Sequence, residues 1–242
     1  IVAPHEQLPR DWPVHGTTGY RFANVVNGLF VDPAAKTRLD RAWRAFVGDE
    51  AADFEELAYR CRRLVMATSL SGELTVLANA LLRLARADRR TRDFTLNSLR
   101  QALAEVVACF PVYRTYVTAK TSSQDRRFID WAIGRAHRRG RAADATVFEF
   151  IRCVLLGKPP PGADPELRAG YLAFTQRLQQ YTAPVTAKGV EDTAFYRHHR
   201  LVALNEVGGD PDVFGFTVSA FHGASRDRAL RWPRSMLASS TH

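Results

Sequence analysis

The chain has 242 residues, enough to bury one generous hydrophobic core or two modest ones. Its 46% of hydrophobic and 24% of charged residues are typical of a soluble globular protein. The net charge of +9 would suit a nucleic-acid surface, but the basic residues are mostly arginines that lie in pairs along several predicted helices, so we expect solvated helix faces.

The first predicted elements follow a proline-rich start. Residues 1–31 are expected to be irregular or extended, because three prolines interrupt any helix before residue 14. Asp32 followed by Pro33 is typical of a helix start. From there to Gly157, apolar residues recur with the helical period and predict one helix after another. The apolar stripes lie within residues 39–47, 54–65, 74–84, 96–107, 128–136 and 147–155.

A stiff proline-rich connector at 158–162 separates these helices from the last part of the chain. Asp164 and Pro165 then predict the start of a long helix whose apolar face continues to Tyr181. Beyond it, short strands are predicted at 184–187, 201–204 and 236–240, with one helix near 217–230. The pattern therefore predicts a helical insertion of about 36–181 within the strands and loops of an α/β fold.

Three negative observations narrow the class of protein. No apolar run approaches ~18 residues, so no membrane span is expected. Cys61, Cys109 and Cys153 lie far apart among apolar residues and lack metal-ligand spacing, which predicts buried free thiols in a reducing compartment. No signal-peptide pattern is visible, and the chain starts at Ile1, so we expect a segment of a longer cytoplasmic protein.

The most informative segment is residues 181–197, where an apolar stretch precedes Lys188, Glu191 and Asp192. In α/β folds, ligands bind at the edge where strands end and helices begin. These three side chains could therefore line a polar pocket for a hydroxyl-rich substrate. Alternatively, the two acids could lie in the first turn of a short helix and complement its dipole.

Other candidate sites are weaker. The loop at 205–211 could bind a ligand, but Gly-Gly-Asp-Pro is also ordinary turn chemistry, which we favour. His198 and His199 lack a third ligand at suitable spacing, so no metal site is expected. The residues alone thus indicate a polar site near 188–210 and no particular reaction.

Several motifs in order resemble the maltooligosyl trehalose synthases of the α-amylase superfamily. The resemblance extends over essentially all 242 positions, and the combination is highly specific although each piece alone is not. The motifs are Gly16-Thr-Thr-Gly-Tyr20, Val26-Asn-Gly-Leu-Phe-Val-Asp-Pro33, Asp88 to Leu96, Cys109-Phe-Pro-Val-Tyr-Arg114, Lys188 to Arg197, and Leu204-Asn-Glu-Val-Gly-Gly-Asp-Pro211.

The resemblance implies part of a (β/α)8 TIM barrel, from about the end of strand 5 to the end of strand 7. It places a loop region at 1–35, a large, mostly helical insertion at 36–181, and a barrel segment with strands 6 and 7 at 182–242. It also implies an intramolecular transglycosylation in trehalose biosynthesis. The reducing-end α-1,4 bond of a maltooligosaccharide becomes an α,α-1,1 bond, with no cofactor, no metal, no nucleic acid and no membrane.

The resemblance also implies that no catalytic residue lies in the chain. The nucleophilic Asp, the acid/base Glu and a third Asp are expected beyond its two ends. The segment alone should therefore be inactive, and the rest of its polypeptide is needed to complete the barrel. The residues expected to bind substrate are His242, Lys188, Glu191, Asp192 and Tyr20.

Three positions depart from the pattern of the family. Arg21 stands where an acidic residue is common, Thr186 replaces a usual Met, and Gly223 replaces a larger residue. Two other classes stay open from the residues: a basic helical nucleic-acid-binding protein and a non-catalytic helical scaffold. Salt-dependent binding to random duplex DNA would indicate the first class.

Overall fold

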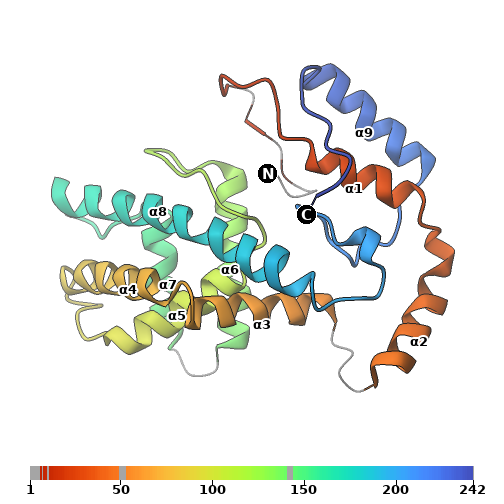
Figure 1. Ribbon diagram of the computed structural model, residues 1–242. Helices are drawn as coiled ribbons and strands as arrows, with labels where there is room; N and C mark the ends of the chain where they lie inside the picture. Colours follow the sequence, from red (N-terminus) through yellow and green to blue (C-terminus); the bar gives the residue numbers. More distant parts are fainter. Residues whose placement is uncertain (1–5, 7, 10, 49–52, 141–143, 242) are drawn as a thin grey trace. The chain divides into compact units, whose positions relative to one another are not determined.

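The computed structural model describes residues 6, 8–9, 11–48, 53–140 and 144–241, and it is helical throughout (Figure 1). Short helices of other types join the α-helices: η1 (Pro33–Ala35) and η4 (Val202–Leu204) are 3-10 helices, and η3 (Ala187–Ala194) is a π-helix. The α-helices are α1 (Tyr20–Leu29), α2 (Lys36–Val47), α3 (Phe54–Ala67), α4 (Ser71–Arg86), α5 (Leu96–Ala108), α6 (Ser123–Arg139), α7 (Ala145–Leu155), α8 (Pro165–Thr186) and α9 (Val218–Arg231).

The chain divides into two compact units. One comprises Tyr59–Val190, and the other combines Ile1–Ala58 with Glu191–His242. We call them the helical unit and the terminal unit.

The core of the helical unit is built around α5. This helix packs against α4, α6, α7 and α8, and its Leu99, Leu103 and Val106 are fully buried. Each fully buried aliphatic side chain contributes roughly 1.5–3 kcal/mol to stability. Asp144 caps α7, because its carboxylate accepts a hydrogen bond from the Thr146 N–H at 2.9 Å. Asp164 likewise caps α8.

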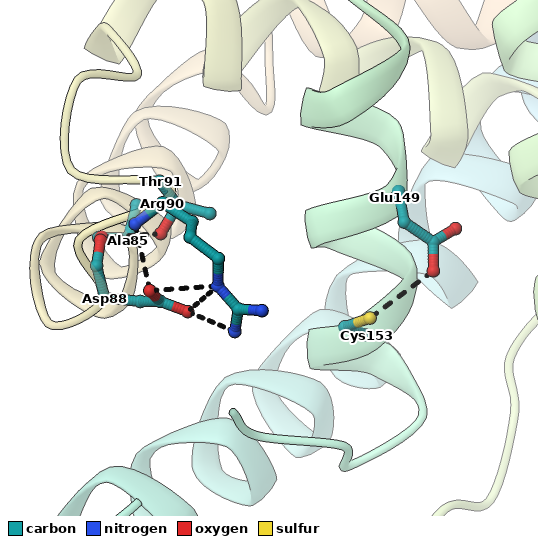
Figure 2. A network of polar contacts seen from close by, with 6 residues as sticks. All are labelled: Ala85, Asp88, Arg90, Thr91, Glu149 and Cys153. Atoms are coloured by element: carbon teal, nitrogen blue, oxygen red, sulfur yellow. Dashed lines mark hydrogen bonds and ion pairs between the residues drawn. The ribbon is translucent and has the colours of Figure 1, made fainter. Parts of the chain in front are cut away.

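A tight turn after α4 holds the motif that begins at Asp88 (Figure 2). The Asp88 carboxylate accepts hydrogen bonds from both the backbone N–H and the guanidinium of Arg90, at 2.9 Å each. The Thr91 hydroxyl donates to the Ala85 carbonyl at 2.7 Å. The Cys153 thiol donates to the Glu149 carboxylate at 3.5 Å, and Figure 2 draws this contact. Cys61 and Cys109 are buried as predicted, whereas Cys153 is only half-buried, because it lies on the same face of α7 as the exposed Glu149.

The terminal unit brings α1 and α9 side by side (Figure 1). Its core includes Ala23, Val25, Leu204 and Phe214. The predicted helix start at Asp32 is confirmed, since its carboxylate accepts from the Ala34 N–H and Pro33 opens η1, which leads into α2. The prediction that residues 1–31 lack a helix is wrong, because α1 begins after the last of the early prolines.

The predicted strands are also wrong. Residues 184–186 end α8, residues 202–204 form η4, and no strand exists in the described part of the chain. A short apolar run cannot be told from a buried helix segment by its pattern. Here the run continues a helix that already satisfies its own backbone hydrogen bonds, whereas a strand would need a paired neighbour. The described residues therefore do not confirm the partial barrel that the resemblance implies.

Among the described helices, none is by itself long and apolar enough to cross a membrane, although α3 and α4 reach that apolarity together as a pair bent by 82°.

Candidate functional site

The charged segment at 187–194 continues α8 without a break, and it does so as a π-helix. Pro184 lies just before this change and removes one backbone donor from the α-helical ladder. Wider π turns occur frequently at functional sites, because they change the direction in which side chains point. Gly189 is required here: a Cβ atom would lie 2.8 Å from the Arg62 Cα, so the two helices could not approach as they do.

The three charged residues of this segment have different environments. Lys188 and Asp192 are exposed, whereas Glu191 is only 6% exposed. The alternative that Glu191 and Asp192 begin a helix is wrong, because the helical backbone runs continuously from Pro165.

Glu191 contacts the loop at 205–211. Its carboxylate accepts a hydrogen bond from the Gly208 N–H at 3.3 Å, within the terminal unit. A buried carboxylate is costly unless it is hydrogen-bonded, and this contact is one of those that compensate it. Glu191 thus helps to fix the loop.

Asparagine side chains fix the same loop from two further directions. The Asn205 amide donates to the carbonyls of Phe195 and His198, at 2.9 and 2.7 Å. The Asn24 amide on α1 donates to the carbonyls of Val207 and Tyr20, both at 2.9 Å. Tyr20, half-buried at the first position of α1, is thereby joined to the loop through Asn24.

Glu206 joins the loop to the end of the described chain. Its carboxylate accepts from the Asn27 amide at 3.2 Å and from the Thr241 hydroxyl. Thr241 immediately precedes His242, the predicted substrate-binding residue, which lies outside the described residues. Sequence reasoning missed Asn24, Asn27 and Glu206; the available signal was the pair of asparagines three residues apart, which share one face of a helix.

A buried histidine lies behind the loop. His198 is 2% exposed and packs against the rings of Trp43 and Phe54, with centroids 5.1 and 5.2 Å away. Burial, with a further contribution from the positive charge of Arg200, lowers the pKa of His198 to about 4. The imidazole is therefore neutral at physiological pH.

Arg200 organises the charges around this histidine. Its guanidinium forms ion pairs with Asp40 at 3.1 Å and Asp212 at 3.6 Å, and it donates to the Pro211 carbonyl. Burial alone would raise the pKa of Asp40, but the hydrogen bond from Lys36 and the charge of Arg200 lower it. These groups border a cavity of ≈ 60 Å³. Loop 205–211 is thus held by an arginine at its end as well as by amides.

The structure therefore brings Glu191 to the loop directly, and Tyr20 only through its backbone carbonyl, which accepts from Asn24, while Lys188 belongs to the helical unit. No group of three or more His, Cys, Asp or Glu residues in the described ranges could hold a metal ion. The arrangement offers exposed charged groups and a rigid loop rich in backbone amides. Such groups can bind the hydroxyls of a sugar.

Comparisons with known proteins match the whole chain, although no family model matches it. A Mycobacterium tuberculosis protein named as a maltooligosyl trehalose synthase is 30% identical over all 242 residues, which make up 28% of its length. The solved maltooligosyltrehalose synthase from Arthrobacter ramosus matches 100% of the chain at 32% identity, with a TM-score of 0.80 over 28% of its own length.

A more distant structure agrees with these two. It is described as a hypothetical maltooligosyl trehalose synthase from Sulfolobus tokodaii, and it matches the whole chain with a TM-score of 0.67 and 25% identity. The chain spans only about a quarter of each relative. Over its full length, the chain is therefore homologous to one segment of the maltooligosyl trehalose synthases.

Proposed function

We propose that the chain is part of an enzyme that converts the reducing-end α-1,4 bond of a maltooligosaccharide into an α,α-1,1 bond. The observation that carries this proposal is that the whole chain matches a segment of the Arthrobacter ramosus enzyme, in both sequence and fold. The product would be a maltooligosaccharide that ends in trehalose. Within this enzyme, residues 36–181 would form a helical insertion, and the ranges 1–35 and 182–242 would flank it.

The chemistry of such a reaction needs two carboxylates, one as nucleophile and one as acid/base. We propose that these lie in other parts of the polypeptide. The role of this segment is then to hold the released glucose while it turns, so that its anomeric hydroxyl attacks in place of water. Isomerisation exceeds hydrolysis only where water is excluded and the free sugar is oriented.

The environments of the candidate residues support two different roles, contact with the sugar and positioning of the loop. Lys188, Asp192, Tyr20 and His242 would contact sugar hydroxyls. Glu191 differs from these, because its burial and its bond to the Gly208 N–H support a positioning role for loop 205–211. Glu206 would act similarly on the residues around Thr241.

The first test compares the chain with its complete polypeptide. When incubated with maltopentaose, the product of the complete gene is expected to form a non-reducing trehalosyl oligosaccharide, whereas residues 1–242 alone are not, because the two carboxylates are missing. Loss of reducing ends measures the reaction, and the Arthrobacter ramosus enzyme serves as the positive control. A trehalosyl product from residues 1–242 alone would refute the inactivity of the segment, and none from the complete protein would refute the function.

A second test concerns Glu191 in the complete enzyme. Glu191→Ala removes the acceptor for the Gly208 N–H, so the loop loosens and more glucose should be released by hydrolysis. A lost hydrogen bond to a buried charge costs about 1.5–3 kcal/mol, so isomerisation should slow by roughly tenfold or more. Glu191→Gln keeps an acceptor oxygen and should recover most of the activity.

Lys188→Ala tests direct contact with the sugar in the same assay. We expect a higher KM or a larger share of glucose, whereas Lys158→Ala, at an exposed lysine of the proline-rich connector, should change neither. If Glu191→Ala and Lys188→Ala both leave the kinetics and the product ratio unchanged, the segment has no part in holding glucose.

A further inference from the structure

A second concave site lies within the terminal unit, between α1 and α9, which run side by side (Figure 1). It is a partly open cavity of ≈ 90 Å³ bordered by the segment that follows α9 and by residues near the start of the chain. The function proposed above makes no use of this cavity.

Three arginines line the cavity. Arg21 comes from the first turn of α1, and Arg228 and Arg231 come from the last turn of α9. Two carboxylates, Glu6 and Asp227, also line it, so the positive groups are in excess. Like charges that share a cavity repel one another, and a bound anion relieves that repulsion.

The three arginines differ in whether an acidic side chain neutralises their positive charge. Arg231 is paired with Asp227, with the Nε atom 2.6 Å from the carboxylate. Arg228 lies over the ring of Phe22, with its guanidinium carbon 4.9 Å from the ring centroid, which holds it against α1. Neither Arg21 nor Arg228 forms an ion pair with any residue that the structure describes. Two guanidinium groups on different helices are therefore available to a ligand.

The rest of the lining is mixed: it includes apolar side chains, namely Leu8, Phe22, Val25, Ala224, Trp232 and Met236, and a few polar groups that suit an anion. The N-cap of α1, Gly19, has no capping side chain, and the first turn carries no acidic residue, so the positive end of the helix is uncompensated. The hydroxyl-bearing residues Thr17 and Ser235 lie at the same cavity. Its volume is more than enough for a single water molecule, so a small anion has room to enter.

We infer that this cavity binds a phosphate group, held by the guanidinium groups of Arg21 and Arg228. The planar guanidinium matches two oxygens of a phosphate at once, which a lysine would not do. The ligand could be free inorganic phosphate or the phosphate of a sugar monoester, whose sugar would extend out of the opening. The inference also assigns a role to Arg21, which stands at a position where the resemblance implies an acidic side chain.

The experiment is a calorimetric titration of residues 1–242 with inorganic phosphate and, separately, with glucose 1-phosphate, at constant ionic strength. We expect saturable binding of at least one of them, weakened about tenfold by Arg21→Gln and by Arg228→Gln, since each removes a charge-assisted hydrogen bond. The tighter ligand identifies the source of the phosphate group. Circular dichroism checks that each variant is folded.

Arg226→Gln is the matched control, because Arg226 is exposed on α9 and does not line the cavity. Binding should be unchanged in this variant. Absence of saturable binding to both compounds would overturn the inference, as would equal affinity in Arg21→Gln, Arg228→Gln and the unmodified chain. The result is independent of the transglycosylation assay, so either proposal can fail without the other.

Discussion

Replacing Gly19 by alanine is expected to destabilise the terminal unit by roughly 3 kcal/mol. Gly19 has φ +89°, a left-handed conformation that costs other residues about 1–2 kcal/mol. A Cβ atom there would also lie 2.4 Å from the Met236 carbonyl oxygen and 2.5 Å from the Ala238 nitrogen. These are backbone atoms, so the chain itself must shift, and such overpacking costs about 1–3 kcal/mol.

Urea denaturation followed by tryptophan fluorescence measures this effect. Trp12, Trp43 and Trp232 all belong to the terminal unit, so the signal reports mainly on that unit. Gly223→Ala is the matched control. Gly223 lies within α9, a Cβ atom there meets nothing within 4 Å, and alanine should stabilise the helix by up to about 1 kcal/mol. Equal unfolding midpoints for Gly19→Ala and the unmodified chain would show that the contact between α1 and residues 236–238 does not form in solution.

Helices were predictable from the sequence wherever two local signals agreed. At Asp144 and Asp164, a capping side chain precedes a run of apolar residues with helical spacing, and both helices begin there in the structure. The segment at 183–187 carried only one signal, a short apolar run. Its conformation depends on the long helix that precedes it, which the local pattern does not contain.

From the sequence, some residues of the candidate site could be identified, but the contacts between them could not. Glu191 was identified from its neighbours as a candidate for lining a polar pocket, but its bond to Gly208 joins residues 17 positions apart. The roles of Asn24 and Glu206 depend on contacts across more than 30 positions, to Val207 and Thr241 respectively. Polar residues of this kind look like ordinary surface groups until the fold brings their partners together.

His198 should make the terminal unit sensitive to acid. The ordinary pKa of histidine is 6.5, and burial lowers that of His198 to about 4 in the folded chain. At pH 7 the imidazole is neutral in both folded and unfolded chains, so it contributes no pH dependence. Below pH 6.5 the unfolded chain takes up a proton and the folded chain does not, so the free energy of unfolding falls until about pH 4. The total loss is up to about 3 kcal/mol.

The groups that face His198 determine whether this loss is seen. Asp40 would favour a protonated imidazole, but it is already paired with Lys36 and Arg200, and Arg200 itself disfavours the added charge. Arg44, Asp53 and Asp212 border the same cavity. The pKa of Asp212 is raised, first by desolvation and then by the charge of Asp210. This carboxylate therefore loses its negative charge early on acidification and stabilises a protonated His198 less.

His198→Leu isolates the contribution of the imidazole. Neither ring nitrogen of His198 has a hydrogen-bond partner among the described residues, so leucine gives up no bond there, and stability at pH 7 should be retained or improved. Between pH 7 and pH 4.5 the unmodified chain should lose about 2–3 kcal/mol more than His198→Leu, measured by urea denaturation at both values. His199→Leu, at the exposed neighbour, should keep most of the acid sensitivity of the unmodified chain, because burial and Arg200 lower the pKa of His198 more than His199 does. Equal losses of stability in His198→Leu and the unmodified chain on acidification would contradict this prediction. The imidazole would then take up a proton as easily in the folded chain as in the unfolded one. The buried contact with Trp43 and Phe54 would be absent in solution.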